Sequence, residues 1–111
     1  MSERVSNPFA GRPLTLIELA AMIEARIEDQ DIRDPEPTAH EGFYDWIRRR
    51  RAFAEALLVE LADDDGCRFK IDGCDTSRMR LAGISISCAG GPLQMLTGWC
   101  RKARAAAEAR L

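Results

Sequence analysis

Four consecutive arginines, at residues 48–51, are the most unusual group of charged side chains in the sequence. Guanidinium groups bind phosphates and carboxylates, so this run indicates contact with nucleic acid or with an acidic protein surface. Four successive residues of a helix point around the whole cylinder, however, and do not share one face. Asp45 precedes Arg49 by four residues, a spacing that favours an ion pair within a helix. Glu55 follows Arg51 at the same spacing, so a solvated helix with internal ion pairs is the second interpretation.

A second set of cations lies in the C-terminal half and comprises Arg78, Arg80, Arg101, Lys102 and Arg104. If the predicted hairpin packs beside the last helix, these side chains merge into one positive patch, the usual electrostatic footprint of nucleic-acid binding. The sequence contains no RNA-binding aromatic signature, zinc finger or basic zipper that would support such binding. This set is therefore the alternative site, in which the protein is a small nucleic-acid-binding regulator.

The four cysteines, Cys67, Cys74, Cys88 and Cys100, have no C-x-x-C spacing of the kind that holds zinc. Without a secretory signal, free thiols are the expected state. Three of them occupy apolar positions of the predicted elements, where cysteine packs as a small hydrophobe. Cys74 lies in a predicted turn and is the one expected to be exposed, so a sensor or small enzyme that uses this thiol is a third class of function.

Catalytic and metal sites are not predicted. Residues 83–87 do not form a nucleophile elbow, and the single histidine, His40, lies in the first turn of a predicted helix. The turn before the last predicted helix contains Ser85, Ser87, Gly90 and Gly91. Backbone N–H groups there could hold an anion, but the lysine of a P-loop is missing, so a structural turn is favoured. We expect no enzymatic activity, no cofactor and no metal ion.

The composition is that of a globular protein. In 111 residues, apolar types make up 46% and charged types 31%, which fits one domain. No stretch approaches the ~20 apolar residues that span a bilayer, and no signal peptide is recognisable, so we expect a cytoplasmic protein with no membrane segment. Charge is uneven, because residues 1–47 hold four arginines against ten acids and residues 48–111 hold twelve Lys or Arg against eight acids.

Two helices are expected before residue 66. Residues 1–13 form an irregular arm, and residues 14–111 form a single α+β domain. Thr15 and Glu18 read as a capping box that starts the first helix, whose apolar stripe is Leu16, Leu19, Ala20, Ile23 and Ile27. After an acidic, proline-broken loop, Thr38 and Glu41 form a second capping box for a helix that ends near residue 62. Its buried side is expected to contain Phe43, Ile47, Ala54, Leu57, Leu58 and Leu61, with Gly66 as the C-terminal cap.

A hairpin and a last helix complete the predicted order, α-α-β-β-α. Cys67, Phe69 and Ile71 alternate with Arg68, Lys70 and Asp72, as in a half-buried strand. The returning strand changes parity at Ala82-Gly83, which predicts a β-bulge. The last helix starts at Pro92 and buries Trp99 among other apolar residues. An antiparallel hairpin packed on helices leaves strand edges exposed, so we expect one edge to pair with another chain, for example in a homodimer.

Parts of the C-terminal half, Gly83-Ile84-Ser85-Ile86-Ser87, Gly91-Pro92 and Leu96-Thr97-Gly98-Trp99-Cys100-Arg101-Lys102-Ala103, resemble the ends of small proteins encoded by phages and prophages. Genes of that kind often specify inhibitors of host defence, including anti-CRISPR proteins, or small regulators. The resemblance identifies no functional residue. It implies a protein that acts as a stoichiometric binder of a macromolecule.

These observations favour a non-enzymatic inhibitor of a host protein or nucleoprotein complex. It would act by occlusion, or by imitating the charge of nucleic acid with its acidic N-terminal half. The residues expected to contact such a partner are Arg48, Arg49, Arg51, Trp46, Glu28, Asp31, Asp34 and Glu36. The alternative remains a nucleic-acid-binding regulator that uses the basic residues of the second and last helices and of the hairpin.

Overall fold

The computed structural model describes residues 13–72 and 76–110, so the predicted N-terminal arm lies outside it up to residue 12. The elements are α1 (Pro13–Arg33), α2 (Phe43–Asp65), β1 (Arg68–Asp72), β2 (Thr76–Leu81), β3 (Ile84–Cys88) and α3 (Pro92–Arg110). The predicted α+β class is confirmed. The order, α-α-β-β-β-α, contains one strand more than the sequence predicted, and the three strands form an antiparallel sheet in the order β1-β2-β3.

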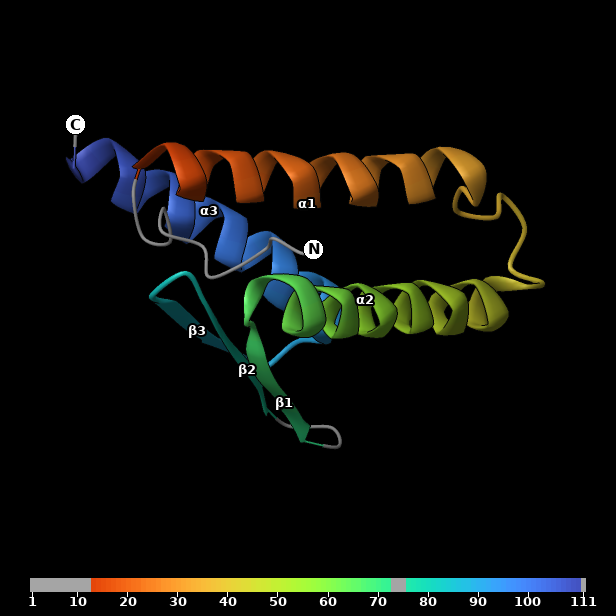
Figure 1. The fold of residues 1–111 in the computed structure, drawn as a ribbon. Helices are drawn as coiled ribbons and strands as arrows, with labels where there is room; N and C mark the ends of the chain where they lie inside the picture. Colours follow the sequence, from red (N-terminus) through yellow and green to blue (C-terminus); the bar gives the residue numbers. More distant parts are fainter. Residues whose placement is uncertain (1–12, 73–75, 111) are drawn as a thin grey trace.

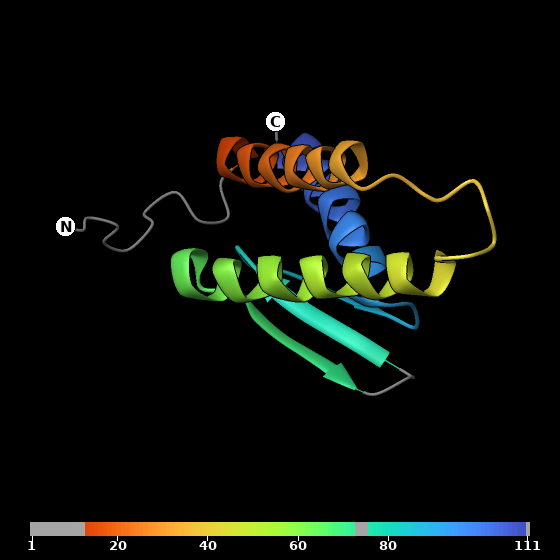
Figure 2. The ribbon, with the colours of Figure 1, turned by 90° about the vertical axis from the view of Figure 1, so that its right-hand side faces the viewer.

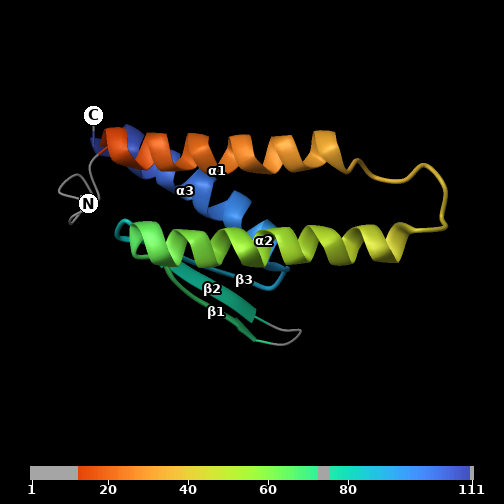
Figure 3. The same cartoon turned by 45° about the vertical axis from the view of Figure 1, so that its right-hand side comes forward.

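Helix α3 is the centre of the fold. It crosses behind α1 and α2 and contacts both of them, and it also packs against β3 and β2 (Figures 1 and 2). Helix α2 packs against β1, the first strand, and lies on the same side of the sheet as α3 (Figure 3). Of the described elements, none covers the opposite side of the sheet (Figures 1 and 2). The sheet therefore has one face packed on helices and one open face.

The apolar stripes predicted from helical spacing form the core. The largest fully buried side chains include Leu16, Ile23, Leu57, Leu58, Leu61, Met95, Leu96 and Trp99. The prediction for α2 was wrong at Ile47, which is 43% exposed, because the N-terminal half of α2 extends beyond the sheet. In that region α2 faces the end of α1 and the loop after it, which leave one side of the helix in solvent.

Helix boundaries differ from the predicted caps. Thr15 lies inside α1 and is buried, because the helix already begins at Pro13, a residue suited to the first turn. Helix α2 is preceded by Gly42, with φ of +86°, rather than by Thr38. The prediction of Gly66 as the C-terminal cap is confirmed, since it has φ of +74° and its N–H donates to the carbonyl of Leu61.

The parity change after β2 comes from a tight turn and not from the predicted bulge. Ala82 and Gly83 form a two-residue connection, with φ of +53° and +82°, and Leu81 pairs directly with Ile84. Two positive φ values are the mark of the turn that best matches strand twist. The buried indole of Trp99 fixes this turn, because its Nε1 donates to the carbonyls of Leu81, at 3.3 Å, and Ile84, at 3.1 Å.

Substitutions in this turn should change stability in opposite directions. Gly83→Ala places a Cβ where nothing lies within 4 Å, so its cost is backbone strain alone, about 1–2 kcal/mol. Ala82→Asn introduces a residue that tolerates positive φ and should raise the free energy of unfolding by about 0.5–1 kcal/mol. Urea unfolding of the two variants beside the wild type measures both changes. Equal stability of all three proteins would contradict the assigned turn.

None of the helices in the described part of the chain is both long and apolar enough to cross a membrane.

Candidate functional site

The strand register sorts the residues of the sheet onto two faces. Phe69, Met79 and Ile86 are aligned across the three strands and pack against the apolar core. The intervening positions point to the uncovered side of the sheet, because successive strand residues alternate between faces. Their exposed side chains are Arg68, Lys70, Thr76, Arg78, Arg80, Ser85 and Ser87, which we call the open sheet face.

Like charges lie directly opposite each other on this face. Arg68 of β1 pairs with Arg80 of β2, and Lys70 pairs with Arg78. Directly opposed like charges destabilise a sheet, typically by a few tenths of a kcal/mol up to about 1 kcal/mol for each pair. Two such pairs side by side make this face a candidate binding surface.

The arginines of the open sheet face are not neutralised within the described structure. No ion pair there involves Arg68, Arg78 or Arg80. On β3, the positions opposite Arg78 and Arg80 are Ser87 and Ser85, which carry no charge. The field of these guanidinium groups therefore extends into solvent and favours an anionic ligand.

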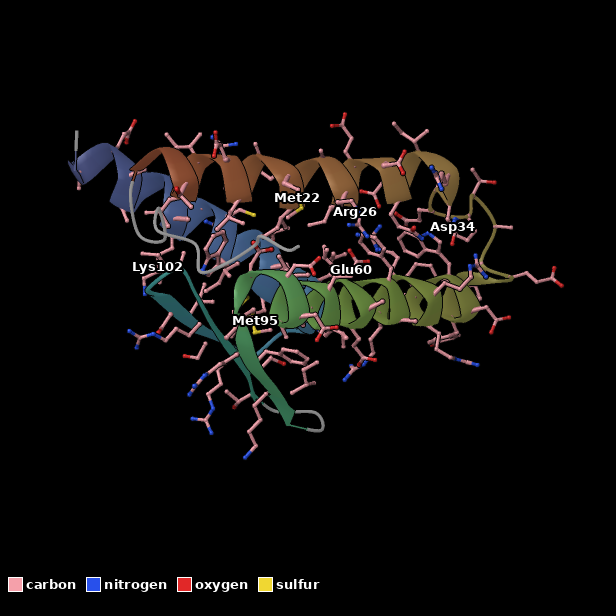
Figure 4. All side chains as sticks on the ribbon, in the orientation of Figure 1. Met22, Arg26, Asp34, Glu60, Met95 and Lys102 are labelled. Atoms are coloured by element: carbon pink, nitrogen blue, oxygen red, sulfur yellow. The ribbon has the colours of Figure 1, made fainter. Side chains whose placement is uncertain are left out.

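Lys102 of α3 adds a further cation at the edge of this face. Its Nζ donates to the backbone carbonyl of Ser85, at 2.7 Å, and its side chain lies beside β3 (Figure 4). Lys102 and the three strands line a shallow, open hollow of about 640 Å³. A broad hollow of this kind suits the surface of a polymer better than a small molecule, which proteins usually enclose.

Of the basic residues predicted as the alternative site, the fold brings Arg78, Arg80 and Lys102 together. Arg104 is directed elsewhere, since its guanidinium forms a bidentate pair with Glu24 of α1, at 2.6 and 3.2 Å. Arg101 is exposed on α3 but does not line the hollow.

Neither Arg68 nor Lys70 was predicted to belong to this set. The alternation of charged and apolar residues along 67–72 indicates that Arg68 and Lys70 lie on the same face of a strand. Only the register between β1 and β2 shows that this face is the one that carries Arg78 and Arg80.

The arginine run at residues 48–51 is paired throughout. Arg51 binds Glu55 one turn later at 3.1 Å, as its spacing predicted, and Arg48 lies 3.5 Å from Asp45, the carboxylate that the sequence analysis assigned to Arg49. Arg49 and Arg50 instead reach the end of α1 and the following loop, where they bind Asp34 and Asp31. These arginines hold α2 against α1, as does the bidentate pair between Arg26 and Glu60 (Figure 4).

The residues predicted to contact a protein partner take part in the same network. Arg49 donates two hydrogen bonds to Asp34 and holds the pKa of that carboxyl below its usual value. Trp46 is half-buried, donates its Nε1 to the carbonyl of Asp34 at 2.8 Å, and lies under the guanidinium of Arg50. The two other acidic residues of the set, Glu28 and Glu36, are exposed and have no ion-pair partner in the described regions.

The described cysteines, Cys67, Cys88 and Cys100, are free thiols. Cys67 and Cys100 are buried, and burial raises the thiol pKa to about 11 for Cys67 and to about 12 for Cys100. Both therefore remain protonated and weakly nucleophilic near neutral pH. Cys74, the cysteine predicted to be exposed, lies outside the described residues.

Other candidate chemistry in the described regions is sparse. His40 is exposed and precedes α2, rather than lying in its first turn as predicted, because the helix begins at Phe43. Within residues 13–72 and 76–110, no three His, Cys, Asp or Glu side chains gather closely enough to hold a metal ion.

Comparisons of the chain with protein-family models, with curated proteins and with solved structures found no match in any of the three. The resemblance to phage-encoded inhibitors stays a prediction. The geometry and charge of the open sheet face are therefore the basis for a functional proposal.

Proposed function

We propose that the protein binds nucleic acid through its open sheet face. The observation that carries this proposal is the pair of like-charged cross-strand contacts, Arg68 opposite Arg80 and Lys70 opposite Arg78. They stand on an uncovered surface, and the repulsion between Arg68 and Arg80, which no ion pair of the described residues offsets, is relieved when a polyanion binds over them. Phosphate groups are the common biological ligands of such closely spaced guanidinium and ammonium groups.

The overall charge of −2 is compatible with this function, because charge is separated along the chain. Residues 68–111, which contain the whole sheet and α3, hold eight Lys or Arg against three acids. Residues 1–67 hold eight arginines against fifteen acids, and several of those arginines are paired. A local basic surface is sufficient for phosphate binding, and the acidic remainder would orient the molecule as it approaches a polyanion.

The residues predicted for an inhibitor support that function less well. Asp31 and Asp34 would have to imitate phosphates, but both carboxylates are bound by arginines of α2. Trp46 would have to anchor a partner, but its indole N–H already has an acceptor within the domain. Inhibition of a host complex by these residues therefore remains a prediction, and the nucleic-acid alternative becomes the main proposal.

The test is the binding of a fluorescein-labelled 20-base-pair DNA duplex, followed by fluorescence anisotropy at increasing NaCl concentration. Phosphate contacts release counterions, so the logarithm of the binding constant should fall against the logarithm of the salt concentration with a slope of about −3 to −5 for a handful of contacts.

A further inference from the structure

We infer that the nucleic acid bound is double-stranded DNA and that the open sheet face lies in its major groove. This inference rests on the proposed function and specifies the ligand and the mode of binding. It depends on three features of the open sheet face: the types of its side chains, the width of the sheet, and the spacing of two arginines on its central strand.

The side chains of the open sheet face do not suit unpaired bases. Proteins that bind single strands stack the bases on aromatic side chains, which supply much of the affinity. The one aromatic residue within the strands, Phe69, points to the opposite side and packs against the core. The exposed side chains on this face of the strands belong to arginine, lysine, serine and threonine, and none of them is aromatic. These groups bind phosphates and the polar edges of paired bases, so the surface favours a duplex.

The dimensions of the sheet select the groove. Neighbouring strands lie about 4.8 Å apart, so the backbones of β1 and β3 are separated by about 10 Å. The major groove of B-form DNA is about 12 Å wide and admits an α-helix or a two-stranded β-ribbon, so β2 and one neighbouring strand fit within it, whereas the minor groove, at about 6 Å, is too narrow. The major groove of double-stranded RNA is deep and narrow, and side chains cannot read it. A three-stranded sheet with no described element over its outer face therefore fits DNA better than RNA.

The central strand places two arginines where base edges would lie. Arg78 and Arg80 are two residues apart on β2, which corresponds to about 7 Å along the strand and therefore to about two base-pair steps. Arginine binds the O6 and N7 acceptors of guanine with two hydrogen bonds, the commonest specific contact in the major groove. Arg68 and Lys70 on β1, and Lys102 beside β3, flank this pair and would bind the phosphates on either side.

The test compares two GC-rich duplexes of identical sequence, one with guanine and one with 7-deazaguanine at every guanine position. The substitution removes the N7 acceptor in the major groove and leaves base pairing and phosphate charge unchanged. We expect the full chain to bind the modified duplex about tenfold more weakly. A duplex with inosine for guanine, which lacks only the minor-groove amino group, should bind as the unmodified duplex does.

Arg80→Lys provides the matched variant, because lysine keeps the charge but loses the two-pronged contact. The variant should bind guanine duplex more weakly and lose part of the discrimination against 7-deazaguanine. Equal affinity of the wild type for both duplexes would overturn the major-groove mode while leaving nucleic-acid binding intact. Tighter binding to single strands or to duplex RNA would overturn the choice of DNA, and absence of binding to every nucleic acid would overturn the proposed function as well.

Discussion

Replacement of both Arg78 and Arg80 by glutamate is expected to weaken nucleic-acid binding strongly and to make the domain more stable. Each arginine lies opposite a cation of β1, so the double variant replaces like charges by opposite charges in both cross-strand pairs. The expected gain in the free energy of unfolding is about 0.5–2 kcal/mol for both pairs together. Loss of two contacts and reversal of their charge should weaken duplex binding by about 100-fold or more. Chemical unfolding and anisotropy measure the two effects on the same protein.

The matched control is Arg48→Glu with Arg51→Glu, which changes the net charge by the same amount on α2. Both side chains are exposed, and each is paired with a neighbour on its own helix. We expect this control to keep its affinity within a few-fold of the wild type and to lose a little stability, because it places like charges at helical spacing. Strong loss of binding by the α2 control, with retention by the sheet variant, would place the binding surface on the arginine run.

Replacement of Trp99 by phenylalanine is expected to lower the stability of the domain substantially. The indole is fully buried, and its Nε1 is the donor for the carbonyls that flank the β2–β3 turn. Phenylalanine leaves these carbonyls without that donor and creates a small cavity, so the free energy of unfolding should fall by about 2–4 kcal/mol. For a domain of this size, that is a substantial part of the total stability.

Trp46→Phe is the control for this prediction. It removes the same N–H group, but Trp46 is half-buried and water can replace the lost partner at the carbonyl of Asp34. Its cost should stay below about 1.5 kcal/mol, the usual net value of one hydrogen bond. Urea unfolding of both variants gives the comparison, and similar losses for the two tryptophans would show that the hydrogen bonds of Trp99 do not hold the turn.

Local patterns were enough to predict the parts of the fold that local chemistry determines. The apolar stripe of α1 lies in the core as the helical spacing required, and Gly66 ends α2 because the backbone there needs a positive φ. The turn at Ala82-Gly83 was missed because alanine with a positive φ is uncommon, so a bulge with one glycine was the more ordinary explanation of the parity change. The exposure of Ile47 depends on where α2 extends beyond the sheet, which helical periodicity does not determine.

The candidate site could be predicted only in part, because it is made by strand register. The sequence shows that Arg78 and Arg80 share one face of a strand, and that Arg68 and Lys70 share one face of another. Only the pairing of β1 with β2 places all four on the same surface. For the arginine run at residues 48–51, the density of charge suggested a binding site, whereas its side chains form ion pairs within the domain. The loop between α1 and α2 brings Asp34 to Arg49, a contact that no local spacing predicts.

The most direct test of the central claim is the salt dependence of duplex binding by the wild type and by Arg68→Ala. The open sheet face predicts measurable binding at low salt, with a steep negative slope of the logarithm of the binding constant against the logarithm of the salt concentration. In Arg68→Ala, that slope should become shallower by about 0.9, the value expected for the loss of one phosphate contact. No binding at low salt, or binding with the same slope in both proteins, would contradict the assignment of this face as the nucleic-acid-binding surface.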